Sequence, residues 1–127
     1  MFVGIDIGTE GTRAAIYDSI GKLCARADYP LTTFRLQYSW IEHDAREWWR
    51  SASHSIKECV AKVLAPDAIK AVSVCGTSGT IVPISDHGEP LRRAILYSDT
   101  RATEQAEELS RDDEIMELSK TQSSKMD

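Results

Sequence analysis

The sequence predicts an α/β fold in which helices pack on a mixed β-sheet. Three apolar runs joined by short turns come first, a pattern typical of an antiparallel meander. A segment with apolar residues at helical spacing follows, and a β-branched run comes after it. The 127 residues suit one domain and suffice to bury a core without disulfides or a metal.

The first three predicted strands cover residues 2–7, 12–18 and 23–29. The first is apolar and β-branched over most of its length, as a buried strand is. Glycines mark the turns at residues 8–11 and 19–22. Because both connections are short, neighbouring strands are expected to pair antiparallel.

The pattern changes after residues 30–40, which show no clear period and are predicted to form a loop. Asp44 and Glu47 form a D-x-x-E start that is expected to cap a helix. This helix is expected to end near Leu64, before Pro66. Its predicted apolar stripe comprises Trp48, Ala52, Ile56, Cys59, Val60 and Val63.

A further strand is predicted over residues 68–75, which are β-branched, and residues 76–79 form the turn that ends it. Residues 80–85 form a second extended run, in which Pro83 indicates an edge or a bulge. A short extension is expected within residues 91–97.

The C-terminal part is predicted to be helical, with a helix over residues 100–109. Asp112 or Asp113 is expected to cap a last short helix, and residues 119–127 to form a polar tail. That last helix contains Ile115, Met116 and Leu118. The order is β-β-β-α-β-(β)-α, for which the ribonuclease-H-like fold is the common architecture.

Charge and composition exclude several classes of function. The net charge of -5 gives a surface that repels nucleic acid and anionic lipid. No apolar run approaches the roughly 18 residues of a membrane span, and the N-terminus lacks the basic region of a signal peptide. Cys24, Cys59 and Cys75 are too scattered for a zinc site or a dithiol pair, so we expect reduced, mostly buried thiols in a cytoplasmic protein.

The turn after the first predicted strand carries residues that suit a phosphate group. The Asp6 carboxylate lies at the end of a buried strand, where it needs a hydrogen bond or a nearby cation. Gly8 and Gly11 let the backbone N–H groups of the turn approach a ligand closely. The candidate phosphate-binding residues are Asp6, Gly8, Thr9, Gly11, Thr12 and Arg13, with Asp6 placed to hold Mg²⁺ through water. The alternative is an ordinary hairpin whose glycines satisfy the turn geometry.

All three tryptophans, Trp40, Trp48 and Trp49, fall within one short segment. We expect Trp48 and Trp49 to anchor the predicted helix on the sheet. His43 is expected to be a surface or capping residue, and none of the three histidines has an evident partner in the sequence. No chemistry is assigned to this segment.

Two later segments offer candidate substrate contacts. The candidates are Gly76, Thr77, Ser78, Tyr97, Asp99 and Arg101. The first three follow a strand, where α/β proteins place ligand loops, so their hydroxyls suit a polyol; a solvated turn is the alternative. Of the others, Asp99 is equally suited to cap the helix that follows.

Taken in order, these segments resemble the N-terminal part of the FGGY carbohydrate kinases, which include xylulose, ribulose, gluconate and glycerol kinases. Members begin with a strand ending in Asp-x-Gly-Thr and an Arg four residues later, matched by Asp6, Gly8, Thr9 and Arg13. A Trp-x-Glu-x-Asp-x-x-x-Trp-Trp-like segment is matched by Trp40, Glu42, Asp44, Trp48 and Trp49. A Gly-x-Pro-Leu stretch runs into Ala-Ile-x-Trp/Tyr-x-Asp-x-Arg, matched by Gly88, Pro90, Leu91, Ala94, Ile95, Tyr97, Asp99 and Arg101.

The resemblance implies a ribonuclease-H-like, actin-like ATPase fold and transfer of the γ-phosphoryl group of ATP to a sugar hydroxyl. It implies ATP and Mg as cofactors, with Asp6 and the hairpin against the phosphates. It also implies that the loop at residues 76–80 borders the sugar, together with Tyr97, Asp99 and Arg101. Glycerol kinases carry an Arg-Glu pair where this chain has Ser78-Gly79, and Trp in place of Tyr97. A pentulose such as xylulose or ribulose is therefore favoured over glycerol.

Two-domain kinases of this family are several times longer than this chain, and their catalytic base lies beyond the matching part. We therefore expect residues 1–127 to be the N-terminal portion of such a kinase, with the base beyond Asp127 and little activity alone. An exposed apolar face is expected to promote self-association. The alternative is a stand-alone, non-catalytic module that binds a sugar, a nucleotide or a partner chain.

Overall fold

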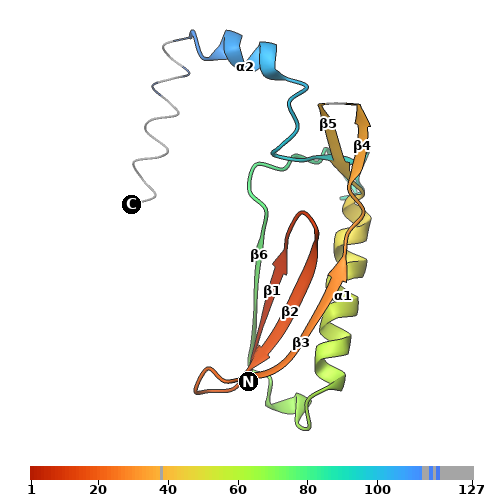
Figure 1. Ribbon diagram of the computed structural model, residues 1–127, viewed down its shortest axis with the longest axis vertical. Helices are drawn as coiled ribbons and strands as arrows, with labels where there is room; N and C mark the ends of the chain where they lie inside the picture. Colours follow the sequence, from red (N-terminus) through yellow and green to blue (C-terminus); the bar gives the residue numbers. More distant parts are fainter. Residues whose placement is uncertain (38, 113–114, 116, 118–127) are drawn as a thin grey trace.

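The computed structural model describes residues 1–37, 39–112, 115 and 117. Its first three strands are β1 (Phe2–Ile7), β2 (Gly11–Tyr17) and β3 (Leu23–Pro30). They pair antiparallel in the order of the chain, and Figure 1 shows them side by side. The predicted meander is confirmed.

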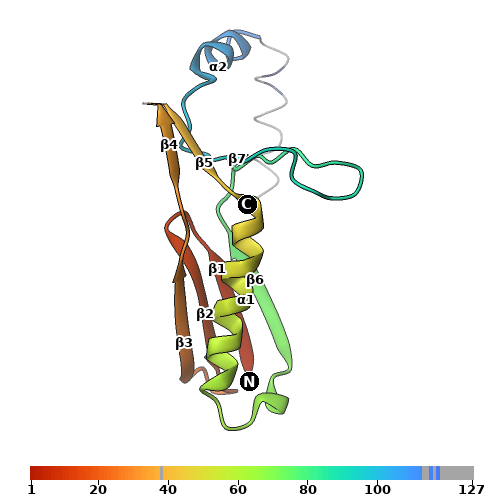
Figure 2. The same cartoon turned by 90° about the vertical axis from the view of Figure 1, so that its right-hand side faces the viewer.

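A fourth strand, β6 (Ala71–Gly76), lies parallel to β1 and completes a mixed sheet of order β3-β2-β1-β6. Helix α1 (Ala45–Ala61) runs along one face of this sheet (Figure 2). A short 3₁₀ helix, η1 (Pro66–Ala68), leads from α1 into β6, which therefore begins later than predicted. The predicted mixed sheet with a helix packed on it is confirmed.

The hydrophobic core lies between α1 and the meander. Alternate residues of each strand face the helix, because side chains along a strand point to opposite faces in turn. The buried strand residues are Val3, Ile5, Ala14, Ile16, Ala25 and Ala27. From the stripe predicted for this helix, Ala52 and Cys59 are buried among them, and Ile56 and Val60 pack partly buried against them. Val63 does so too, although α1 ends at Ala61, earlier than the predicted Leu64.

The apolar surface continues onto β6, which α1 does not cover. Val72 and Val74 pair in register with the buried Val3 and Ile5, so they lie on the helix side of the sheet. They are nevertheless 58% and 60% exposed. The chain thus has the exposed apolar face that its sequence led us to expect, and self-association through this face stays a prediction.

The segment at residues 30–40, predicted to be a loop, contains strand instead. Strands β4 (Phe34–Gln37), β5 (Trp40–His43) and β7 (Ala94–Ile95) form a second, three-stranded antiparallel sheet. The loop prediction was wrong because strands this short show no readable period. Strand β5 pairs on one side with its neighbour β4 and on the other with β7, which lies far along the chain.

The extended run predicted at residues 80–85 does not form a strand. Within the described residues it makes two isolated bridges, Ile81 with Ile95 and Ile84 with Pro90. Pro83 has no amide hydrogen, so a regular ladder cannot continue through it.

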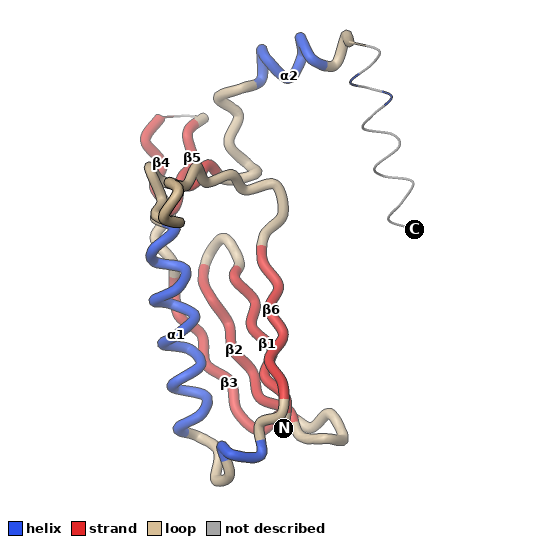
Figure 3. The backbone as a smooth tube through the Cα atoms, turned by 180° about the vertical axis from the view of Figure 1, so that it is seen from behind, coloured by secondary structure: helices blue, strands red, loops and turns tan. Residues whose placement is uncertain are grey.

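Helix α2 (Thr103–Leu109) begins later than predicted and stands away from the sheet (Figure 3). Asp99 does not cap it: the N-cap position is Ala102, and the Asp99 carboxylate is engaged elsewhere. Asp112 accepts a hydrogen bond from the Ile115 amide at 3.3 Å. The rest of the predicted last helix, with Asp113, Met116 and Leu118, and the tail at residues 119–127 lie outside the described residues.

The start of α1 follows the prediction only in part. Asp44 caps the helix, since its carboxylate accepts a hydrogen bond from the Arg46 amide at 3.0 Å. Glu47 instead accepts bonds from the amide and the hydroxyl of Thr32, both at 3.1 Å. Trp49 is 77% exposed, so its predicted anchoring role was wrong. Adjacent helical residues point about 100° apart, and Trp48 takes the inward direction.

The cysteines are more exposed than predicted. Cys59 is buried under α1, whereas Cys24 and Cys75 are exposed, and all three are free. The expectation of mostly buried thiols was wrong because Cys24 lies on the edge strand β3 and Cys75 on the uncovered β6. Among the described residues, no helix combines the length and the apolar character needed to cross a membrane.

Replacing Gly11 with alanine is expected to lower the free energy of unfolding by about 2 kcal/mol, as overpacking does. A Cβ at this position would lie 2.6 Å from the Tyr29 carbonyl oxygen on β3. Gly4→Ala is the matched control, because a Cβ there meets nothing within 4 Å. Urea denaturation of both variants measures the difference, and equal losses would contradict the close β2–β3 approach as the cause.

Candidate functional site

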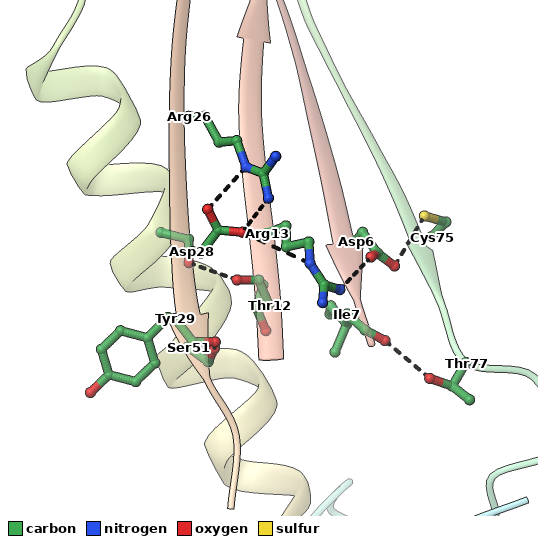
Figure 4. A network of polar contacts seen from close by, with 11 residues as sticks. Asp6, Ile7, Thr12, Arg13, Arg26, Asp28, Tyr29, Ser51, Cys75 and Thr77 are labelled. Carbon is green, nitrogen blue, oxygen red and sulfur yellow. Dashed lines mark hydrogen bonds and ion pairs between the residues drawn. The ribbon is translucent and has the colours of Figure 1, made fainter. Parts of the chain in front are cut away.

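The carboxyl ends of β1 and β6 meet at one edge of the sheet. Because these strands are parallel neighbours, with Ile7 opposite Gly76, the hairpin after β1 and the loop after β6 leave the sheet side by side. Thr77 joins them, since its amide and its hydroxyl donate to the Ile7 carbonyl at 3.2 and 3.3 Å (Figure 4). The structure thus brings together the two loops that the sequence singled out.

A row of polar side chains crosses all four strands next to this edge, on the face that α1 leaves open (Figure 4). Arg13 lies within it: Nη1 donates to Asp6 Oδ2 at 3.0 Å, and Nε lies 3.8 Å from Asp28 Oδ1. Arg26 donates two hydrogen bonds to Asp28, which lower the pKa of that carboxyl. The Cys75 thiol lies 3.7 Å from Asp6 Oδ1. Asp6 therefore has the cationic partner that its position requires.

The hairpin glycines serve close packing and not an unusual turn conformation. Neither Gly8 nor Gly11 has a positive φ, so the alternative of glycines needed for turn geometry is not supported. A Cβ at Gly8 would lie 3.0 Å from Arg13 Nη1, so this glycine leaves room for the Asp6–Arg13 pair. Within the described residues, the amides of Thr9 and Glu10 at the hairpin tip have no hydrogen-bond acceptor. Two N–H donors are thus available to an anion.

Thr12 points away from this row. It alternates with Arg13 along β2 and is 0% exposed, on the helix side of the sheet. Its Oγ1 has no hydrogen-bond partner among the described residues. The two-residue period of the strand therefore separates Thr12 from the other candidate phosphate residues.

Tyr97 packs against the loop that follows β6. Gly79 adopts a φ of +73°, and a Cβ there would lie 3.2 Å from Tyr97 Cβ, so glycine permits both the backbone conformation and the contact. The Tyr97 side chain remains 59% exposed. A cavity of about 200 Å³ lies between the two loops, and its lining includes Gly8, Thr77 and Trp48.

Asp99 and Arg101 bind each other. Asp99 Oδ2 accepts hydrogen bonds from Arg101 Nη2 and the Ile41 amide, both at 2.7 Å, and Oδ1 accepts from Arg101 Nε at 2.8 Å. The Asp99 side chain is 1% exposed. Hydrogen bonds from Arg101 hold the pKa of Asp99 well below its usual range, and the same pairing raises the pKa of Arg101.

Glu42 extends this ion-pair network to β5. Its Oε1 accepts hydrogen bonds from Arg101 Nη2 at 2.9 Å and Arg92 Nη2 at 2.7 Å, and its side chain is 5% exposed. The Arg101 guanidinium also lies 4.2 Å from the centroid of the Trp40 ring. The network pins the segment that carries Tyr97 to β5. In the sequence, Glu42 was only a member of a motif, and nothing local revealed its two arginine partners.

His43 lines the cavity between the two loops, a position that sequence reasoning missed. It is 2% exposed, so the expectation of a surface or capping residue was wrong. Trp48 Nε1–H donates to His43 Nδ1 at 3.1 Å, and His43 Nε2 lies 2.9 Å from Thr33 Oγ1. The Thr33 hydroxyl in turn donates to the Thr9 carbonyl at 3.4 Å. These partners come from three separate parts of the chain, so no local pattern reveals them.

These contacts define the protonation state of His43. Because the indole N–H donates to Nδ1, that nitrogen must carry a lone pair, and the single ring proton lies on Nε2. Nε2–H then donates to Thr33 Oγ1. Burial lowers the pKa of His43, although the Glu47 carboxylate and the Thr9 carbonyl both favour the charged ring. The ring is therefore neutral in the folded chain.

Acidification is expected to destabilise the fold through His43. Its folded pKa lies below the ordinary value of 6.5, so the unfolded chain binds the proton first and the stability falls as the pH drops below 6.5. Each unit of difference between the folded and unfolded pKa values of His43 corresponds to about 1.4 kcal/mol of the free energy of unfolding. Thermal unfolding between pH 8 and 5 measures this, and His43→Gln is expected to flatten the dependence. An unchanged slope in that variant would assign the effect to other groups.

The residues present fit a hydrated Mg²⁺ ion held together with a phosphate group. Asp6 is 46% exposed, so its carboxylate is accessible to a hydrated cation. Among the described residues, no three of His, Cys, Asp and Glu cluster as a metal cage. A metal here would take one carboxylate from this part of the chain, with water and phosphate as its other ligands, which is how Mg²⁺ is held in phosphoryl-transfer sites.

Comparison with known proteins shows similarity over nearly the whole chain. The sequence profile of the FGGY family of carbohydrate kinases, N-terminal domain, matches residues 1–126. A glycerol kinase of Citrifermentans bemidjiense is 37% identical over 109 residues, which are 84% of this chain and 22% of the relative. A xylulose kinase of Staphylococcus epidermidis is 31% identical over 108 residues, again 84% of this chain and 22% of the relative.

The structure is similar to that of a xylulose kinase from Rhodospirillum rubrum, with a TM-score of 0.81 and 28% identity over 87% of this chain and 23% of that one. The fold is therefore ribonuclease-H-like, of the actin-like ATPase type, as predicted. The chain spans about a fifth of the length of the curated relatives it matches.

Proposed function

The chain belongs to the FGGY family of carbohydrate kinases, and on this basis we propose that it is the N-terminal portion of an ATP-dependent sugar kinase. The reaction is transfer of the γ-phosphoryl group to a hydroxyl of a ketose or a polyol. The catalytic base is expected in a region beyond Asp127 that corresponds to the unmatched part of the longer relatives. The reduced cysteines suit the cytoplasm, where we place the reaction.

One observation carries this proposal: the Asp6–Arg13 pair and the loop at residues 76–80 share the edge where β1 and β6 end. A phosphate donor held at the hairpin and a hydroxyl acceptor held at the loop would therefore be adjacent. Such adjacency is what phosphoryl transfer needs most, because its catalysis consists of positioning and charge stabilisation.

The residues divide the work as follows. The Thr9 and Glu10 amides and Arg13 bind phosphate oxygens, and Gly8 leaves room for the Asp6–Arg13 pair. Asp6 would hold Mg²⁺ through water, and the bound ion would neutralise charge on the phosphates. Arg13 orients the Asp6 carboxylate through the 3.0 Å hydrogen bond. Thr12 has no part in phosphate binding, because its side chain is buried on the helix side of the sheet.

The sugar lies against Thr77, Ser78 and Tyr97. Ser78 and Gly79 offer no charge at the loop, and Tyr97 offers a phenolic ring and hydroxyl, which suits a pentulose such as xylulose or ribulose better than glycerol. Arg101 forms ion pairs with Asp99 and with Glu42. Because these polar groups are already paired, we assign Asp99 and Arg101 to positioning Tyr97 and not to contacting the sugar.

The test is a kinase assay on the protein at its natural length. ADP release and the mass of the sugar product are measured with ATP, Mg²⁺ and xylulose, ribulose, gluconate or glycerol. We expect kcat/KM for a pentulose to exceed that for glycerol by about tenfold or more. A preference for glycerol would overturn the sugar assignment, and no phosphorylation of any sugar would overturn the kinase. Sugar binding without phosphorylation would favour the non-catalytic module.

A further inference from the structure

We propose that His43 is a positioning residue of the phosphate hairpin: through Thr33 it holds the Thr9 carbonyl, and thereby aims the Glu10 amide at the phosphate. This inference rests on the proposed function, because it takes the hairpin to be the phosphate site. His43 itself lies behind the hairpin, in the lining of the cavity, and does not touch the phosphate.

A chain of hydrogen bonds with a single donor-to-acceptor direction runs from Trp48 through His43 and Thr33 to the Thr9 carbonyl. The Trp48 indole N–H donates to His43 Nδ1, His43 Nε2–H donates to Thr33 Oγ1, and the Thr33 hydroxyl donates to the Thr9 carbonyl. The indole can only donate and the carbonyl can only accept, so both ends of the chain fix its direction. A neutral His43 with its proton on Nε2 is the one state that satisfies every link.

The peptide between Thr9 and Glu10 links the direction of the Thr9 carbonyl to that of the Glu10 N–H. The described chain contains no cis peptide, so the Thr9 carbonyl and the Glu10 N–H point in opposite directions. Holding the carbonyl towards Thr33 turns the Glu10 N–H away from the linker between β3 and β4. Within the described residues this amide has no acceptor, so its donor is available to a ligand.

The linker between β3 and β4, which carries Thr33, makes further contacts with the hairpin and with α1. Leu31 donates its amide to the Glu10 carbonyl at 3.1 Å, and Thr32 donates its amide to Glu47 on α1 at 3.1 Å. Three consecutive residues thus fasten the hairpin tip to α1 and β5. The hairpin tip is held in place before a ligand arrives, which reduces the entropy that binding must overcome.

The test compares Thr33→Val, which removes the hydroxyl at constant shape, with Thr33→Ser, which restores it, in the protein at its natural length. Thr33→Val is expected to raise the KM for ATP about fivefold, as the loss of one hydrogen bond would. The KM for the sugar is expected to stay unchanged, and Thr33→Ser to rescue the KM for ATP. An unchanged KM for ATP, or an equal rise for the sugar, would overturn the positioning role.

A second pair of variants addresses His43 directly. The Gln side chain of His43→Gln can place an N–H near the position of Nε2, whereas the shorter side chain of His43→Asn cannot reach Thr33. We expect the KM for ATP to remain near that of the unchanged protein in His43→Gln and to rise about fivefold in His43→Asn. Equal KM values for ATP in the two variants would overturn the positioning role of the His43–Thr33 hydrogen bond.

Nuclear magnetic resonance separates this inference from the proposed function. The imidazole ¹⁵N shifts report the tautomer, and the ¹H–¹⁵N signal of Glu10 reports the hairpin peptide, whether or not any sugar is phosphorylated. We expect a proton on Nε2 and a Glu10 signal that moves in Thr33→Val but not in Thr33→Ser. A proton on Nδ1, or an unmoved Glu10 signal, would overturn the inference even in an active kinase.

Discussion

Replacing Arg101 with methionine is expected to lower the free energy of unfolding by about 3 kcal/mol, the scale seen when one partner of a buried ion pair is removed. The reason is that Asp99, 1% exposed, and Glu42, 5% exposed, would keep their charges with fewer partners. Methionine preserves the length and much of the packing of the arginine stem. Chemical denaturation of the two proteins measures the difference.

The matched control for this prediction is Arg92→Met. Arg92 binds the same Glu42 oxygen, at 2.7 Å, but its side chain is 46% exposed against 16% for Arg101, and it has no contact with Asp99 among those described. Its loss is expected to cost at most about 1 kcal/mol, as for a surface pair. Similar losses in the two variants would contradict the assignment of the buried network to Arg101.

Asp6→Ala is expected to reduce kcat about 100-fold or more in the protein at its natural length, a scale typical for loss of one charge-stabilising group. In its proposed role Asp6 would act on Mg²⁺ and on phosphate position, which matter most in the transition state, so the KM for the sugar should change little. Steady-state kinetics with saturating ATP and a varied sugar concentration measures both constants.

Asp28→Ala is the matched control, because Asp28 faces the same Arg13 from the other side, at 3.8 Å. It lies on β3, one strand further from β6 than Arg13, and is paired mainly with Arg26. The Asp28→Ala variant is expected to keep kcat within about threefold, since it loses only exposed ion pairs, those with Arg13 and Arg26. A comparable loss in both variants, or an unchanged kcat in Asp6→Ala, would remove Asp6 from its assigned role.

The fold was predictable where its signals are local. Turns at residues 8–11 and 19–22 lie between apolar runs, and the first three strands formed as expected. The stripe of α1 has a clear period, and Asp44 caps the helix in the structure. In each case the residues that decide the structure are neighbours along the chain, so their spacing carries the information.

The prediction failed where structure depends on distant partners. Strand β4 pairs with β5, and β5 pairs on its other side with β7, some fifty residues along the chain. His43 is buried because Trp48 and Thr33 close around it. Asp99 serves Ile41 and Arg101, not the helix that it precedes. The contacts of Asp99 with Ile41 and of β5 with β7 join segments far apart in the sequence, so no local pattern expresses them.

The sequence by itself determined the mixed α/β sheet, the family resemblance and the residues that gather at the hairpin and at the loop after β6. Only the tertiary structure decided which of them face the site. The alternation along β2 buries Thr12 and exposes Arg13, and the Asp99–Arg101–Glu42 network engages two side chains that looked free. Spacing along a chain specifies periodicity, whereas the direction of a side chain and its partners depend on which segments pack together.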